Sequence, residues 1–289
     1  MKRTKRKITA LEITLFIILL CYVLLLILIF AWSLNTSLKT DSNFKEDSIG
    51  LTKSFHFANF INAFTESVQQ VETSRGKTPI YLEGMLLNSV IYAGGSALVQ
   101  VLCTATMAYC TARYKNIVSK IIHNVVIVTL VLPVVGTLPS LLVMLQQLHL
   151  YNSLIGVYIM KFGFNNIYYL IFYAAFSAVS WEYAESAFLD GASHFTVYLK
   201  IMMPLVATLL GTIFLMFFIQ NWNDYQVPML VIDDFPTAAV GIFHLSGSST
   251  ATKQEKLAGG IVLFIPLFIV FILLRNKIMG NLTEGGIKG

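Results

Sequence analysis

Long apolar runs constrain this chain more than any other feature of its sequence. The first run, residues 11–34, carries no charge after Glu12. About 20 predominantly apolar residues are enough for a helix to cross the hydrocarbon core of a bilayer. Further apolar runs follow at residues 85–110, 121–145, 154–179, 205–219 and 257–274. The pattern predicts an all-α integral membrane protein with six transmembrane helices.

Composition favours a protein that keeps its first apolar run. Hydrophobic residues make up 56% of the 289 residues and charged residues only 12%, whereas about a quarter of the residues in a soluble domain are charged. A signal peptide has a shorter apolar region that ends in a small-residue cleavage site. Trp32, Ser33 and Leu34 do not provide such a site, so we expect a first span that is retained.

The distribution of charge predicts the orientation of the spans. With both termini in the cytoplasm, the cytoplasmic segments hold 12 Lys and Arg against 5 Asp and Glu, and the outer segments hold 8 against 10. This asymmetry obeys the positive-inside rule. It accounts for the net charge of +5 without a nucleic-acid partner. The expected organisation is a basic N-terminus (1–10), a first span (11–34), an outer loop (35–84), a core (85–278) with a cytoplasmic loop (181–204), and a cytoplasmic tail (279–289).

The segment from Glu185 to Pro204 is polar and lies between two apolar runs. Asp190-Gly191 is a turn dipeptide that can end a helix with glycine in a left-handed conformation. Pro204 suits the start of the next apolar helix, because the first amides of a helix have no partner to lose. A second short helix is predicted between these points by the helical spacing of Phe195, Tyr198, Leu199 and Met202.

This segment resembles the EAA loop of permeases in importers of the ATP-binding-cassette (ABC) class. The matching positions are Glu185, Ser186, Ala187, Asp190, Gly191, Ala192, Ile201 and Pro204. Ser186 and Met203 depart mildly from the family pattern. The end of the chain, with Thr283, Gly285 and Lys288, resembles the terminus of the smaller permease in the maltose and oligosaccharide branch.

The resemblance implies the type I ABC importer permease fold and a transport role rather than an enzymatic one. A second permease, two ATPase subunits and an extracytoplasmic solute-binding protein would be its partners, with membrane lipid around the spans. ATP and Mg would bind the ATPases, so no cofactor is expected on this chain. The EAA positions would couple the permease to an ATPase, the tail would contact the ATPases, and the location would be the plasma or inner membrane of a prokaryote.

Polar residues at the end of the fifth run are candidates for a substrate path. Amide and carboxylate groups suit sugar hydroxyls, and polar residues at a membrane edge usually face the bundle interior or a cavity. The alternative is that Trp222 and Tyr225 are interface anchors. Lys161 is expected at the interface rather than at the bilayer centre. The candidate path residues are Asn88, Gln220, Asn221, Trp222, Asn223 and Asp224.

Other functions remain as alternatives. An ABC permease for a peptide, an amino acid or a polyol phosphate would share the loop, and a secondary transporter can also contain broken helices. Gly76-Lys77-Thr78 is not a phosphate-binding loop, because such a loop needs a glycine at position 71, where the chain has Val71. The five histidines are scattered, and their spacing predicts no metal site.

Overall fold

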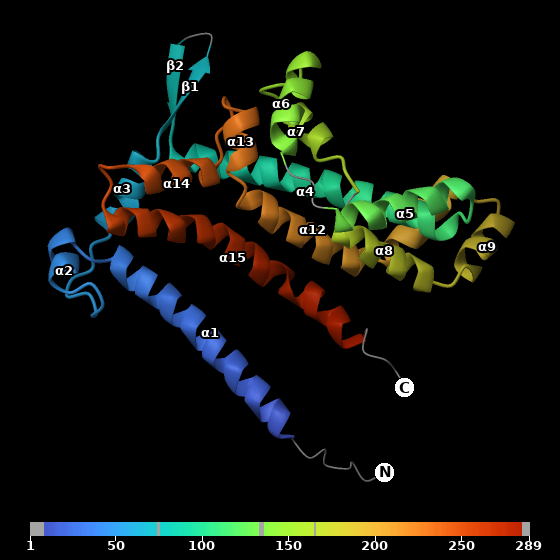
Figure 1. The fold of residues 1–289 in the computed structure, drawn as a ribbon, viewed down its shortest axis with the longest axis horizontal. Coiled ribbons are helices and arrows are strands. Elements are labelled where there is room, and N and C mark those ends of the chain that lie inside the picture. The colour runs from blue at the N-terminus through green and yellow to red at the C-terminus, as the bar shows by residue number, and fades with distance from the viewer. Residues whose placement is uncertain (1–8, 74–75, 133–135, 165, 285–289) are drawn as a thin grey trace. The chain divides into compact units, whose positions relative to one another are not determined.

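The computed structural model describes residues 9–73, 76–132, 136–164 and 166–284 (Figure 1). These residues form two compact units. The first contains the residues up to Ser67 together with His244–Val262, and the second contains Val68–Phe243 and the residues from Leu263 onward. The two units are described separately below.

The first unit begins with a long apolar helix. Helix α1 (Ala10–Ser37) starts at a capping box, in which the Thr9 side chain accepts from the Glu12 amide and the Glu12 side chain accepts from the Thr9 amide. Its membrane-span window has no buried residues, as expected of a helix that is apolar on every side and faces lipid. The segment after α1 folds back onto the end of that helix, since the Trp32 indole donates to the Ser48 carbonyl at 3.0 Å.

The segment after α1 in this unit contains two short helices, α2 (Asp41–Glu46) and α3 (Ala58–Glu66). Lys39 is fully buried here, and its ammonium donates to the Asp47 carbonyl at 2.7 Å. The Asn59 amide donates to the carbonyls of Ser37 and Lys39, both at 2.8 Å. These bonds give the buried polar groups partners, which is what burial requires.

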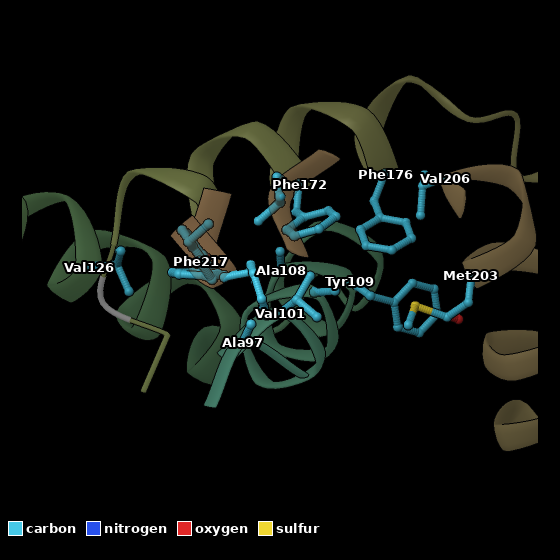
Figure 2. Close-up of a cluster of buried hydrophobic side chains, with 14 of the residues drawn as sticks. Ala97, Val101, Ala108, Tyr109, Val126, Phe172, Phe176, Met203, Val206 and Phe217 are labelled. Carbon is cyan, nitrogen blue, oxygen red and sulfur yellow. The ribbon is translucent and has the colours of Figure 1, made fainter. Parts of the chain in front are cut away.

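The second unit is built on α4 (Leu82–Arg113), against which α8 (Ile167–Ala178) and α12 (Ala207–Trp222) pack. Small residues on α4, such as Ala97 and Ala108, let the other helices approach closely (Figure 2). The other helices are α5 (Ile117–Val131), α6 (Thr137–Gln147), α7 (Leu154–Met160), α9 (Glu182–Leu189), α10 (His194–Val197), η1 (Tyr198–Met202), α11 (Met203–Leu205) and α13 (Gln226–Val231); α14 (Ala238–Gly247) and α15 (Lys253–Glu284) begin in one unit and end in the other.

A β-hairpin precedes α4, and the sequence analysis does not anticipate it. Strand β1 (Gln69–Thr73) pairs antiparallel with β2 (Gly76–Ile80), in a register that sets Val71 opposite Thr78. The Gly-Lys-Thr sequence at 76–78 therefore lies in an exposed strand. The hairpin lies at the opposite end of α4 from α9 (Figure 1).

Three helices of the described residues are long and apolar enough to cross a membrane: Ala10–Ser37, Leu82–Arg113 and Lys253–Leu273. A fourth is obtained if His194–Leu205 and Ala207–Trp222, which meet at a bend of 78°, are counted as one span. The third predicted run, 121–145, is divided between α5 and α6. Two prolines occur in this run: Pro133 lies outside the described residues, and Pro139 falls inside α6. The fourth run is divided in the same way, between α7 and α8.

Candidate functional site

We name residues 181–204 the EAA-like loop. Its first half consists of helix α9 and the turn that ends this helix. The Ala192 amide donates to the Ala187 carbonyl at 2.9 Å, and the Gly191 amide donates to the Phe188 carbonyl at 3.0 Å. This bond pair is a Schellman motif. Gly191 has φ +81°, which confirms the predicted left-handed glycine. A Cβ at this position would meet no atom within 4 Å, so the constraint is conformational rather than steric.

The second half of the loop is a continuous but irregular helical segment. Ser193 caps α10 by accepting from the Thr196 amide at 3.2 Å. One turn of π-helix, η1, follows. Pro204 provides no amide to bond the carbonyl four residues earlier, which favours an irregular turn here. Pro204 lies in the short α11, and the apolar helix α12 begins only at Ala207, after a break at Val206. The predicted start of that helix at Pro204 is therefore early by one short turn.

Aromatic and hydroxyl contacts join the loop to α4. The Tyr198 and Thr106 hydroxyls are 2.6 Å apart, and the Tyr198 ring lies 4.9 Å from the Tyr109 ring. The His194 Nδ1 lies 3.0 Å from the Tyr114 hydroxyl. Tyr109 also meets Phe176 of α8 edge-on at 5.4 Å, in the buried cluster that Figure 2 shows. The loop is thus held by the end of α4 through several rings at once.

Arg113, at the last residue of α4, holds the start of the loop. Its guanidinium lies 5.4 Å from the centre of the Trp181 ring, within the range of a cation–π contact. It also donates to the Val179 carbonyl. Trp181 in turn packs against Phe188 of α9, with ring centres 6.1 Å apart. The helix α9 is therefore fixed at both ends.

Several apolar side chains of the loop are exposed. Leu189 is 90% exposed and Phe195 is 69% exposed. We name this surface the loop face; it is formed by Tyr183, Leu189, Phe195 and Leu199. Of the predicted coupling positions, Glu185, Ser186, Asp190, Gly191 and Pro204 are exposed, whereas Ala187, Ala192 and Ile201 are half-buried. An apolar surface next to exposed polar residues is typical of a protein-docking site.

The residues predicted for the substrate path fall into two groups, which differ in their contacts and in their exposure. Asn221 and Trp222 are buried; the Asn221 amide donates to Gln100 Oε1 at 2.7 Å, and the Trp222 indole donates to the Leu263 carbonyl at 3.0 Å. Asn88 donates to the Pro236 carbonyl at 3.0 Å. These three side chains join elements of the second unit. Gln220 and Asn223 are exposed, and Asp224 is half-buried.

Asp224 is one of three polar side chains that meet at the end of α12. Its Oδ2 lies 3.2 Å from the Lys161 ammonium and accepts from the Tyr92 hydroxyl at 2.8 Å. Its Oδ1 accepts from the Val227 amide at 3.1 Å. The side chains of Lys161 and Asp224 are only 17% and 18% exposed. From the sequence, Lys161 is predicted to lie at the membrane interface, and no partner is predicted for it. The sequence signal that points to a partner is a lone charge inside an apolar run.

A cavity of about 370 Å³, with polar and apolar lining residues, lies beside this ion pair. It is formed by α4, the segment after α7, α8 and α12. Its lining includes Gln100, Lys161, Asn166, Tyr168 and Gln220, of which only Gln220 is among the predicted path residues. Asp224 is not part of the lining.

Hydrogen bonds to Asp233 and Asp234 hold the turn before α7. They thereby also hold the segment that carries Lys161. The Tyr151 hydroxyl donates to Asp233 Oδ2 at 3.2 Å, and the Asp234 amide donates to the Asn152 side chain at 3.1 Å. Burial, together with the nearby Asp233 carboxylate, raises the pKa of Tyr151. This phenol therefore stays neutral and keeps donating over the physiological pH range.

The predicted tail contacts are only partly described. Thr283 lies within α15, and Gly285 and Lys288 lie outside the described residues.

Comparison with known proteins gives relatives along most of the chain. The probable ABC transporter permease protein YurM of Bacillus subtilis (strain 168) is 22% identical over 281 residues, covering 96% of this chain and 89% of that protein. The maltose/maltodextrin transport system permease protein MalG of Vibrio parahaemolyticus is 27% identical, covering 71% and 72%. The arabinooligosaccharides transport system permease protein AraQ of Bacillus subtilis is 23% identical, covering 70% and 72%.

The fold is shared with a solved structure. A chain of a bacterial ABC transporter involved in the import of the acidic polysaccharide alginate matches with a TM-score of 0.72 at 16% identity, covering 96% of this chain and 99% of that chain. The family described as binding-protein-dependent transport system inner membrane component matches residues 100–282. The region of that match includes the EAA-like loop, the ion pair and the C-terminal part of α4. The chain therefore belongs to this family of ABC transporter permeases, the binding-protein-dependent inner membrane components.

Proposed function

We propose that this chain is one permease half of an importer that carries a sugar, an oligosaccharide, across the plasma membrane of a bacterium. It pairs with a second permease, and the two enclose the path. Two ATPase subunits bind ATP and Mg on the cytoplasmic side, and a solute-binding protein delivers the sugar outside. In this arrangement the chain spans the membrane six times with both termini in the cytoplasm, and α5 and α8 complete spans that their own lengths do not fill.

The relatives support a sugar as the solute. MalG is named for maltose and maltodextrin, AraQ for arabinooligosaccharides, and MelC of Bacillus subtilis for melibiose, raffinose and stachyose. All three are matched over 70% or more of this chain. Their shared chemistry is an uncharged molecule with many hydroxyl groups.

The observation that carries the coupling role is the contrast between the two sides of the EAA-like loop. One side is tied to α4 by Tyr198 and His194, and the other exposes the loop face to a partner. An ATPase that docks on the loop face would move α4 and α10 together. Because the segment to Leu205 meets α12 at 78°, such a movement would tilt α12 rather than slide it along its own axis. A tilt of that kind suits a path that opens alternately to each side.

Other predicted contacts belong to the same proposal. The tail, with Thr283, Gly285 and Lys288, adds a second contact to the ATPases. Within the path residues, Gln220 acts at the substrate, Asp224 acts behind it by holding Lys161, and Asn88, Asn221 and Trp222 hold the helices that line the path. Asn223 is exposed beside them.

The test compares two exposed leucines in the full complex. Leu189→Ser changes the loop face, where Leu189 is 90% exposed, and Leu51→Ser changes a leucine that is 86% exposed in the first unit. We expect Leu189→Ser to reduce co-purification of the ATPase at least tenfold and to abolish ATP-driven uptake, because truncation of an anchor residue in an interface costs about 2 kcal/mol or more, and tenfold in affinity is about 1.4 kcal/mol. The measurement is the ratio of ATPase to permease after gentle detergent extraction.

Leu51→Ser is the matched control and leaves that ratio unchanged. Wild-type recovery of the ATPase by Leu189→Ser would contradict the docking role of the loop face. Uptake of a peptide, an amino acid or a polyol phosphate instead of a sugar by the wild-type complex would contradict the proposed substrate while leaving the docking role in place.

A further inference from the structure

The cavity beside α12 presents amide groups that can still bond a ligand. The Gln100 Oε1 accepts from Asn221, which leaves the two amide hydrogens of Gln100 for other acceptors. The Gln220 amide donates to the Tyr168 hydroxyl at 3.2 Å, which leaves its carbonyl oxygen and its second hydrogen. Donors and acceptors in one cavity of about 370 Å³ match hydroxyl groups, each of which both donates and accepts.

The cavity also has aromatic walls. Tyr168 and Phe217 line it, and their rings meet edge-on with centres 4.8 Å apart. An edge-on pair keeps the face of one ring available to a further apolar surface. The carbon–hydrogen face of a sugar ring is such a surface.

The positive charge of Lys161 in the cavity is balanced by Asp224, which lies outside the cavity lining. Lys161 lines the cavity and Asp224 does not, yet the two form an ion pair at 3.2 Å. Both Asp224 oxygens are engaged, by Tyr92 and Lys161 on one and by the Val227 amide on the other. The ammonium group has three donors, and only the one toward Asp224 has a partner among the described hydrogen bonds. The lysine can therefore donate into the cavity although its charge is cancelled.

We propose that this cavity contacts the transported saccharide and selects an uncharged one, with Asp224 as the positioning residue that holds Lys161 and cancels its charge. This inference rests on the proposed function and adds the substrate class. Gln100, Lys161 and Gln220 donate to or accept from hydroxyl groups, and Tyr168 supports a ring. An acidic saccharide gains nothing at this cavity, because the lysine already has its carboxylate.

The contact role is tested with the full importer complex in proteoliposomes. Gln220→Leu removes the amide and keeps the approximate volume of the side chain. We expect about tenfold slower uptake of the uncharged oligosaccharide, the loss that follows from one or two hydrogen bonds to the substrate. Gln226→Leu is the matched control, since Gln226 is also exposed but does not line the cavity, and it keeps wild-type uptake. ATPase activity without sugar reports that both complexes are assembled.

The charge-balancing role is tested by the ratio of two uptake rates, for an uncharged oligosaccharide and for the same sugar oxidised at one end to an aldonate. Asp224→Asn leaves the lysine charge uncancelled and shifts this ratio about tenfold toward the aldonate, because the cavity now carries a net positive charge. The double variant Lys161→Met with Asp224→Asn returns the ratio toward that of the wild type, and Asp224→Glu preserves it. A purely structural ion pair would change the yield of the complex without changing the ratio.

Two results would overturn the inference: wild-type uptake by Gln220→Leu, or an unchanged ratio in assembled Asp224→Asn complexes. A wild-type complex that carries no saccharide would instead overturn the proposed function, and the saccharide assignment of the cavity with it. Saccharide uptake by the wild-type complex alone distinguishes these two failures.

Discussion

The EAA-like loop and the cavity at the end of α12 belong to one unit but depend on different kinds of interaction. The loop is a contiguous segment whose shape depends on the backbone, with a left-handed glycine at Gly191 and a 78° bend after Leu205. The cavity is assembled from three separate stretches of the chain and depends on side chains, above all on the pair Lys161–Asp224. The loop exposes apolar surface to a partner, whereas the cavity keeps a charge half-buried and balanced.

The difference shows where each region is sensitive. In the loop, a substitution that alters backbone conformation should matter more than one that alters charge. In the cavity, a substitution that leaves one charge unpaired should matter most, because a poorly hydrated charge without a partner is costly. The predictions below test this contrast, beginning with the largest effect.

Asp224→Ala should be the most destabilising change at either region. It leaves Lys161 without its counter-ion and the Tyr92 hydroxyl without its acceptor. Because these side chains are less than one-fifth exposed, we expect a loss of about 3 kcal/mol in the free energy of unfolding. Thermal unfolding of the purified complex measures it. Lys161→Met together with Asp224→Ala should recover a large part of the loss, and no recovery would mean that the pair does not act through charge.

Gly191→Ala should have a smaller and more local effect. A left-handed conformation costs a residue with a Cβ about 1–2 kcal/mol, and no clash adds to this cost, because the position is open. We expect weaker ATPase binding with little change in the unfolding temperature of the permease. Gly211→Ala is the control, since Gly211 is a helical glycine in α12 and is equally open. Equal effects of the two substitutions would remove the conformational role of Gly191.

Trp222→Phe should have the smallest effect. It removes the indole bond to the Leu263 carbonyl and keeps most of the ring packing against Phe218, whose centre is 5.6 Å away. We expect a loss of about 1 kcal/mol in stability and no change in the ratio of uncharged to acidic sugar uptake. A changed ratio would place Trp222 in the substrate path. Residues that pack the helices and residues that act on the substrate would then no longer be two distinct groups.

The features that could be predicted from the sequence are those encoded within short segments. The helix end at Asp190-Gly191 follows from turn chemistry alone, and the structure has it. The resemblance to the family is likewise inferred from short contiguous segments, the EAA-like loop and the tail, and the match over residues 100–282 confirms the family. Lys161 and Asp224 are 63 residues apart, and no local pattern indicates that α7 and α12 bring them together. The cavity was missed for the same reason, since Gln100 and Tyr168 are unremarkable within their own helices.

Two further features were missed for physical reasons of a different kind. The two strands of the β-hairpin are mostly polar, with Val71 and Ile80 as their only aliphatic side chains apart from Pro79, so they lack the alternating apolar pattern that predicts a strand. The delayed start of α12 at Ala207 reflects the π-helical turn that precedes Pro204. A proline predicts an interruption of a helix but not how many residues the irregular turn will include.

The central claim is that ATP hydrolysis on partner subunits drives sugar uptake through this chain. The most direct measurement is uptake of radiolabelled oligosaccharide into proteoliposomes that contain the complete complex, with and without ATP inside. We expect the sugar to accumulate above its external concentration only when ATP and the binding protein are present, and we expect Leu189→Ser to abolish this accumulation. Accumulation that proceeds without ATP, or that survives removal of the ATPase subunits, would contradict it.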